Sequence, residues 1–186
     1  MKNHKSNMFK FEEERVKKVL EILNDIEANG LVEDYAIAGG IAAMFYTEPV
    51  FTYDLDFFIL LKPKYMTRRI ITISPISDYL KDKGYSWEGE YIIIEGIPIQ
   101  FIVVNSDLEK ESLKNAEDIM YGQIKTRVLR AEYLIAIFLN AGRKKDFEKI
   151  ERIIDQSKID TEFLNKILKR YNLYDIFIKK CLQHLK

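Results

Sequence analysis

Two aspartates one residue apart are the side chains of this sequence best placed to do chemistry. Asp54 and Asp56 lie in residues 51–61, whose apolar second half predicts a central β-strand. Because side chains alternate along a strand, the two carboxylates are expected on the same face. Carboxylates so close together repel each other unless a cation lies between them. Mg²⁺ or Mn²⁺ prefers such oxygen ligands and also binds nucleotide phosphates, so Asp54 and Asp56 predict a metal site.

A glycine pair precedes this strand. Gly39 and Gly40 follow residues 35–38, which predict a short buried strand, and precede residues 41–47, which predict a short helix. Without side chains, the glycines let backbone N–H groups approach an anion where the helix begins. Taken alone, a Gly-Gly pair is typical of a turn, and an Asp-x-Asp pair of a solvated strand edge. Their order along the chain instead favours a nucleotide site, with a phosphate beside the metal.

The remaining elements predict an α+β chain in two parts. Pro98 indicates that this part of its strand lies at a sheet edge or a bulge. The apolar character that begins at Ala131 predicts a helical region to the end of the chain, so we expect an α/β domain at residues 1–130 and a helical region at 131–186. Helices are predicted at about 9–29, 75–83, 107–117, 131–154, 160–170 and 173–185, and strands at 91–94, 97–104 and within 119–130.

The composition limits the partners, metal sites and cellular locations that we expect for this protein. The 29 basic and 29 acidic residues of the 186 give a net charge of zero, so bulk charge does not require a nucleic-acid partner. The single cysteine, Cys181, excludes an intramolecular disulfide and a multi-cysteine zinc site. The charged N-terminal residues lack a signal-peptide pattern, and no apolar run is long enough to span a bilayer. We therefore expect a cytoplasmic protein without a membrane partner.

Two sequence blocks carry a family resemblance. Residues 36–46 (Ala-Ile-Ala-Gly-Gly-Ile-Ala-Ala-Met-Phe-Tyr) and 51–56 (Phe-Thr-Tyr-Asp-Leu-Asp) resemble the nucleotidyltransferase superfamily of the DNA polymerase β type. The chain is most similar to its small AbiEii-type and minimal members. Residues 96–102 resemble the strand of the family's third carboxylate, and 132–146 its helical segment. The resemblance covers about residues 30–155. It implies a small mixed sheet flanked by helices, followed by a C-terminal helical bundle.

The resemblance also implies roles for individual residues. Asp54 and Asp56 would bind Mg²⁺ or Mn²⁺ and act in catalysis, with Thr52 close by in the nucleotide site. The position that matches the third catalytic acid is Gln100, whose amide carries no charge and cannot take a proton. Glu95 would substitute for it if the strand register slips. Gly39 and Gly40 would hold the nucleotide triphosphate.

Basic and aromatic residues complete the predicted site. Arg143 and Lys145 would reach the triphosphate and neutralise charge on the leaving pyrophosphate, unless they simply form a solvated helix terminus beside Asp146. A second basic cluster either lines an acceptor groove or lies on a solvent-facing strand edge. Three aromatic residues either stack on a base or pack in the core of a hairpin. The basic cluster is Lys125, Arg127 and Arg130, and the aromatic residues are Tyr85, Trp87 and Tyr91.

Three functions follow from these features. The first is a nucleotidyltransferase that binds a nucleoside triphosphate and a divalent metal ion, and transfers a nucleoside monophosphate to a hydroxyl of protein or RNA. The second is a catalytically impaired binding or regulatory module, such as one of a toxin–antitoxin system, and Gln100 is its main support. The third is a structural protein in which the two aspartates have no chemical role.

Overall fold

A computed structural model of the chain describes residues 13–48, 54–65 and 73–182. The predicted nucleotide-binding residue Thr52 lies outside these residues. The same holds for predicted helix residues 9–12 and 183–185 and predicted strand residues 51–53. Among the helices of the described residues, none combines the length and the apolar composition that a membrane crossing needs.

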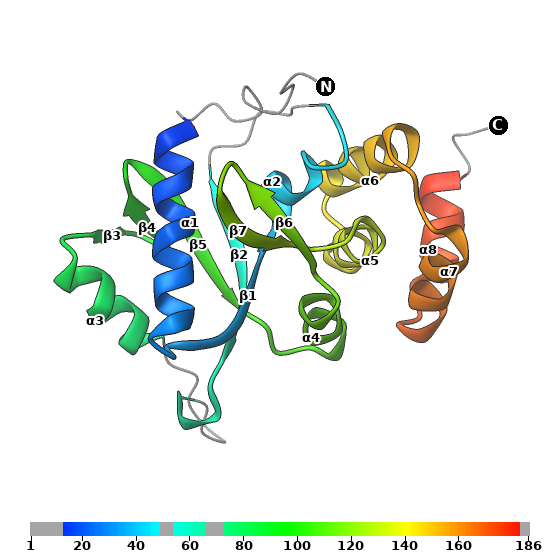
Figure 1. The fold of residues 1–186 in the computed structure, drawn as a ribbon. Helices are drawn as coiled ribbons and strands as arrows, with labels where there is room; N and C mark the ends of the chain where they lie inside the picture. Colours follow the sequence, from blue (N-terminus) through cyan, green and yellow to red (C-terminus); the bar gives the residue numbers. More distant parts are fainter. Residues whose placement is uncertain (1–12, 49–53, 66–72, 183–186) are drawn as a thin grey trace.

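A seven-stranded mixed sheet forms the centre of the molecule (Figure 1). Its strand order is β3-β4-β5-β2-β1-β7-β6. The β2–β5 and β1–β7 pairs are parallel, and the other neighbours are antiparallel. This arrangement confirms the predicted α+β class with a mixed sheet. The strands are β1 (Val32–Ala38), β2 (Leu55–Leu61), β3 (Ser86–Glu88), β4 (Tyr91–Ile94), β5 (Ile97–Val103), β6 (Glu117–Tyr121) and β7 (Ile124–Val128).

The register of the three central strands sets the position of the site. In β2, Asp56 pairs with Ala38 of β1 on one side and with Gln100 of β5 on the other. Most of β2 is buried, as its apolar run predicts for a central strand. Asp56 is therefore flanked by Gln100 and by the residue that precedes Gly39.

Helices cover both faces of the sheet. Tyr35 of β1 hydrogen-bonds Asn24 of α1, whereas the adjacent Asp34 pairs with Arg127, which donates to the Leu113 carbonyl of α4. Because adjacent strand side chains point to opposite faces, α1 and α4 lie on opposite sides. The helices are α1 (Glu13–Ala28), α2 (Gly39–Ala43), α3 (Ser74–Asp82), α4 (Asp107–Lys114), α5 (Ala131–Ala141), α6 (Lys144–Gln156), α7 (Thr161–Arg170) and α8 (Tyr174–Phe177); a 3₁₀ turn (Pro63–Tyr65) and a π-helical turn (Ile178–Leu182) complete the set.

The C-terminal helices gather around α5, at the end of the molecule away from α3 and β3 (Figure 1). α5 is buried along most of its length, and it contacts α2, α4, α6 and α7. This confirms the predicted helical half, but the helix predicted at 131–154 is two helices, separated at Gly142 in the left-handed conformation. One cluster of buried side chains includes residues from the sheet and from the helical half. The division into domains 1–130 and 131–186 therefore stays a prediction.

A single carboxylate ties the helical half to α4. Glu111 of α4 accepts hydrogen bonds from the Tyr133 hydroxyl of α5 at 2.8 Å and from the Tyr171 hydroxyl, and it pairs with Arg170 of α7. Burial raises the pKa of Glu111, but these hydrogen bonds outweigh it and hold the pKa below its usual value. The carboxylate thus stays charged and links three helices.

Some predicted elements differ from the observed ones. α2 begins at Gly39, earlier than predicted, and β3 was not predicted at all. β5 as a whole lies between β4 and β2, but the prediction that Pro98 marks a local edge agrees with the pairing of the strands. Pro98 is tolerated there because pairing with β2 begins only at Ile99, so at Pro98 itself β5 pairs with β4 alone.

Candidate active site

One cavity of about 680 Å³ brings together the predicted site residues that the structure describes. It lies where β2 and β5 begin, between the sheet and α6. Of the eight residues predicted from sequence, seven line it, and Thr52 is the one outside the described part of the chain. The seven are Gly39, Gly40, Asp54, Asp56, Gln100, Arg143 and Lys145.

The glycine turn and Asp56 form the sheet side of the cavity. The Gly40 backbone N–H donates a hydrogen bond to the Asp56 carboxylate. Gly39 has φ of +60°, a conformation that L side chains rarely adopt, and an added Cβ would lie 2.9 Å from the Asp56 Cβ and closer still to its carboxylate. The close contact between the turn and Asp56 therefore requires glycine at position 39.

Gly39→Ala should damage both stability and transfer. We expect the free energy of unfolding to fall by about 2–3 kcal/mol, from the left-handed backbone and the overlap with Asp56. Displacement of that carboxylate should lower the transfer rate about 10²-fold. Urea unfolding and a nucleotide-transfer assay measure the two effects.

Gly84→Ala is the matched control for this change. Gly84 also has positive φ, at +88°, but no atom lies within 4 Å of a Cβ placed there. It should cost about 1 kcal/mol of stability and leave transfer within twofold of wild type. Equal transfer rates in the two variants would contradict a role for the close approach of Gly39 to Asp56.

The charge of Asp56 is incompletely compensated by the positive groups around it. Burial, and then the charge of Asp54, raise the pKa of Asp56 to about 6, while Lys149, Arg143 and the Gly40 N–H act in the opposite direction. A divalent cation would remove this repulsion, so the pair fits such an ion. Within the described residues no group of three or more His, Cys, Asp or Glu is arranged to hold a metal. The fit therefore rests on two carboxylates.

The wall opposite the sheet is basic and belongs to α6. Arg143 is the N-cap residue of this helix, and Lys145 lies in its first turn. Sequence analysis missed three further lining residues, Glu148, Lys149 and Arg152. The sequence could have predicted them, because positions 145, 148, 149 and 152 are separated by the three- and four-residue steps that place side chains on one helix face.

A buried carboxylate orients this basic wall. Asp146 is fully buried, and its Oδ2 accepts from Arg143 Nε at 2.6 Å. Its Oδ1 lies 3.4 Å from Lys149 Nζ. Asp146 thus pairs within its own helix. Arg143, whose side chain is 58% exposed, lies both at the helix terminus and in the cavity wall, so both interpretations of this residue stay predictions.

Gln100 contacts a carboxylate that sequence analysis also missed. Its Nε2 donates to Glu90 Oε2 at 3.2 Å, and Glu90 and Tyr91 both line the cavity. Glu95, considered as a substitute acid, lies elsewhere: it accepts from the Tyr85 hydroxyl at 2.9 Å and does not line the cavity. That alternative is wrong, because β5 keeps the register that places Gln100 beside Asp56.

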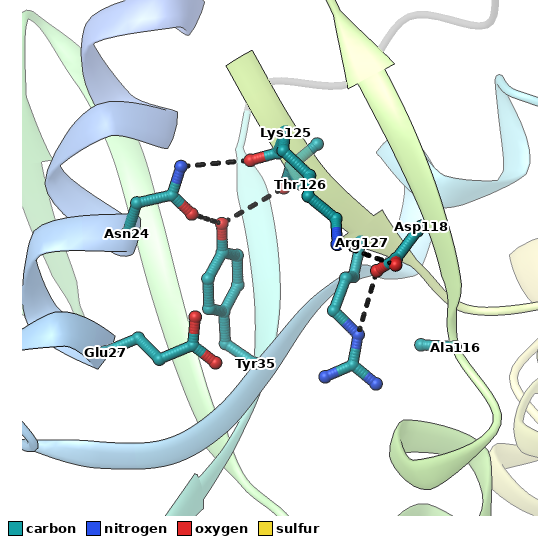
Figure 2. Close-up of a pocket in the computed structure, with 8 residues that line it drawn as sticks. All are labelled: Asn24, Glu27, Tyr35, Ala116, Asp118, Lys125, Thr126 and Arg127. Atoms are coloured by element: carbon teal, nitrogen blue, oxygen red, sulfur yellow. Dashed lines mark hydrogen bonds and ion pairs between the residues drawn. The ribbon is translucent and has the colours of Figure 1, made fainter.

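The second predicted basic cluster lies outside this cavity. Lys125 and Arg127 line a separate hollow between α1 and β7 (Figure 2), where both pair with Asp118. Arg130 pairs with Glu117 and Glu132 instead. Because β7 is an interior strand, the strand-edge interpretation of this cluster is wrong, and the acceptor-groove interpretation stays a prediction.

The hollow in Figure 2 is held together by its own polar contacts. The Tyr35 hydroxyl donates to Asn24 and shares a hydrogen bond of 3.2 Å with Thr126, and Asn24 donates to the Lys125 carbonyl at 2.9 Å. Its basic side chains are paired with Asp118. The contacts account for these polar groups without a ligand.

Comparison with protein families assigns the chain to a family. Residues 15–183 match a family described as "Nucleotidyl transferase of unknown function (DUF2204)". The chain belongs to this family. The superfamily resemblance of the sequence is thereby confirmed, and transfer of a nucleotidyl group is the activity that the family's description carries. No curated protein sequence matches the chain.

Solved structures confirm the nucleotidyltransferase-like fold. An antigenic nucleotidyltransferase-like protein from Paracoccidioides brasiliensis aligns at TM-score 0.55 and 15% identity, over 91% of this chain and 93% of that one. The antibiotic-resistance factor ANT(2'')-Ia aligns in its solution structure at TM-score 0.52 and 12% identity, over 92% and 98%. In complex with adenylyl-2''-tobramycin it aligns at 0.51 and 15%, over 88% and 99%. At these identities the likeness concerns the fold alone.

Proposed function

We propose that the protein binds a nucleoside triphosphate with Mg²⁺ or Mn²⁺ and transfers the nucleoside monophosphate to a hydroxyl group. One observation carries this proposal: Asp54 and Asp56 face a basic helix across a single cavity, beside a glycine turn in contact with Asp56. An anionic substrate would lie between the two walls. The family description supports the same reaction class.

The basic residues and the glycines of the cavity would have different roles in the reaction. Arg143, Lys145 and Lys149 would bind the triphosphate along α6 and stabilise the charge that develops on the leaving pyrophosphate. Gly39 and Gly40 would keep the sheet side free of side chains, so that a phosphate can approach Asp56. When bound at the two aspartates, a divalent cation would polarise the α-phosphate.

The acceptor we propose is a hydroxyl of a protein or an RNA, as in the resemblance to AbiEii-type proteins. A toxin–antitoxin role rests on the same resemblance of residues 36–46 and 51–56. The ANT(2'')-Ia structure with adenylyl-2''-tobramycin supports a hydroxyl acceptor in a protein of this fold, because it holds a nucleotidylated product.

The binding-module hypothesis has one observation in its favour. Gln100 stands where a third carboxylate is expected, and its amide cannot take up a proton. This hypothesis predicts nucleotide binding without transfer. The basic wall of α6 would serve either function.

A transfer assay separates the two. Purified protein is incubated with all four α-labelled nucleoside triphosphates, Mg²⁺ or Mn²⁺, and total RNA or protein. We expect pyrophosphate release and labelled acceptor, both lowered about 10³-fold in Asp54→Asn and Asp56→Asn, because the loss of metal binding removes several kcal/mol of transition-state stabilisation. Asp78→Asn, an exposed aspartate of α3, is the control and should match wild type.

Absence of transfer would contradict the proposal. If wild type releases no more pyrophosphate than Asp54→Asn, yet nucleotide raises its melting temperature, the binding-module function replaces the enzyme. If nucleotide and metal change neither pyrophosphate release nor melting temperature, both fail.

A further inference from the structure

Transfer to a hydroxyl requires a group that takes up the hydroxyl proton. Asp54 and Asp56 would be engaged with the cation. Gln100, beside Asp56 in the sheet, cannot accept a proton. The lysine and arginine side chains of the opposite wall are hydrogen-bond donors and not acceptors. Among the residues that the structure describes, the remaining carboxylates that line the cavity are Glu90 and Glu148.

Glu148 lies on the wrong side for this task. It belongs to α6, on the same helix face as Lys145, Lys149 and Arg152. These cations form the wall where the triphosphate and its leaving pyrophosphate would bind. A carboxylate there would sit beside the departing group, whereas the attacking hydroxyl must approach from the opposite side of the α-phosphate.

Glu90 lies on the sheet side, in the turn between β3 and β4. Its Oε2 accepts a hydrogen bond from Gln100 Nε2 at 3.2 Å. Gln100 in turn pairs in register with Asp56 across the β2–β5 ladder. The amide therefore holds the Glu90 carboxylate towards the two aspartates, although Glu90 comes from a different pair of strands.

Tyr91, which lines the same cavity, is affected by the charges of all three acids. Burial raises the pKa of the Tyr91 hydroxyl, and the charges of Glu90, Asp54 and Asp56 raise it further. The hydroxyl also hydrogen-bonds Glu90. All three acids thus act on the same hydroxyl group of the cavity wall.

We propose that Glu90 is the catalytic residue that accepts the proton of the acceptor hydroxyl, and that Gln100 is a positioning residue that holds it. The assignment rests on the proposed nucleotidyl transfer. As the hydroxyl oxygen bonds to the α-phosphorus, its proton passes to a Glu90 carboxylate oxygen. The bond from the α-phosphorus to the bridging oxygen breaks, and pyrophosphate leaves with that electron pair.

Glu90→Gln tests the assignment, with water as the acceptor so that no acceptor has to be known. We measure nucleoside monophosphate formed from the four α-labelled triphosphates with Mn²⁺. Glu90→Gln should lower kcat about 10²-fold or more, the usual contribution of a positioned base, and leave nucleotide affinity and melting temperature unchanged. The control is Glu88→Gln, an exposed glutamate two residues away that does not line the cavity, and it should match wild type.

An exchange of the two side chains tests the pairing with Gln100. The double variant Glu90→Gln, Gln100→Glu keeps an amide and a carboxylate in contact but moves the acid to the β5 position. Its kcat should be at least tenfold higher than that of Glu90→Gln. A purely structural role for Glu90 would instead lower the melting temperature in Glu90→Gln, and the exchange would not raise kcat.

The outcomes separate this proposal from the proposed function. Transfer by wild type that depends on Asp54 and persists within threefold in Glu90→Gln would overturn the assignment of Glu90 alone. If wild type forms no more monophosphate than Asp54→Asn, the transfer function fails and the assignment fails with it. A lower nucleotide affinity with unchanged kcat would make Glu90 a binding group and overturn its role as proton acceptor.

Discussion

Asp56→Asn should make the metal-free protein more stable while it strongly lowers the rate of transfer. Burial, together with the charge of Asp54, raises the pKa of Asp56 from its ordinary value of 3.8 to about 6, so the ionised carboxylate destabilises the folded state. When the charge is removed, a pKa shift of this size corresponds to an increase in the free energy of unfolding on the order of 2–3 kcal/mol above pH 7. Transfer should fall about 10³-fold in the same variant.

The pH dependence has a defined sign. Between pH 4 and pH 6 the folded protein binds more protons at Asp56 than the unfolded chain does, so wild-type stability from this group falls as pH rises. The stability difference between Asp56→Asn and wild type should therefore be small near pH 4, grow through pH 6 and be complete above pH 7. Urea unfolding in EDTA at pH 4, 6 and 8 measures it.

Two further measurements complete this test. Asp78→Asn should change stability by less than about 0.5 kcal/mol at each pH, as is usual for an exposed site. Mg²⁺ should stabilise wild type and not Asp56→Asn, because a ligand that binds only the folded state raises its stability. A variant that is less stable than wild type at pH 8 would contradict the electrostatic account of Asp56.

Asp146→Ala should have the largest destabilising effect among the site variants. The carboxylate is fully buried and pairs with Arg143 at 2.6 Å and with Lys149 at 3.4 Å. Loss of one partner of a buried ion pair costs about 3–5 kcal/mol, and the partial exposure of the two cations here places the expected value near 3 kcal/mol. Nucleotide affinity should also fall, because Arg143 loses the contact that orients it. Urea unfolding and nucleotide titration measure these effects.

The same helix supplies the control for this variant. Asp155→Ala removes an exposed carboxylate from α6 and should leave stability within about 0.5 kcal/mol and nucleotide affinity unchanged. Asp146→Asn keeps an acceptor for Arg143, so its stability and nucleotide affinity should lie between those of Asp146→Ala and wild type. Equal stability of Asp146→Ala and Asp155→Ala would show that the buried pair does not hold this wall of the cavity.

The sheet side of the site was predictable because it depends on short-range patterns. The apolar run of β2 predicted a central strand. The alternation of side chains along a strand then predicted that the aspartates before and within it share one face. The glycine turn could be placed next to them because it ends the adjacent strand. Gln100 could be placed beside Asp56 only through the family resemblance, and the β2–β5 register agrees with it.

Other parts of the site depend on contacts that a linear pattern does not contain. Glu90 enters the cavity because β3 and β4 fold back onto β5, and the three-residue strand β3 carries too little periodicity to predict that hairpin. The Lys145 face of α6 did have a readable helical period. Its direction towards the sheet follows from the packing of α6 against α5 and α2, which is a tertiary property.

The central claim is that Asp54 and Asp56 together hold a divalent cation that contacts a nucleotide. Anomalous diffraction from crystals grown with Mn²⁺ and a non-hydrolysable nucleoside triphosphate tests it most directly. We predict a manganese peak coordinated by both carboxylates, with the triphosphate extending towards α6. Nucleotide bound elsewhere, or manganese that contacts neither aspartate, would contradict the claim.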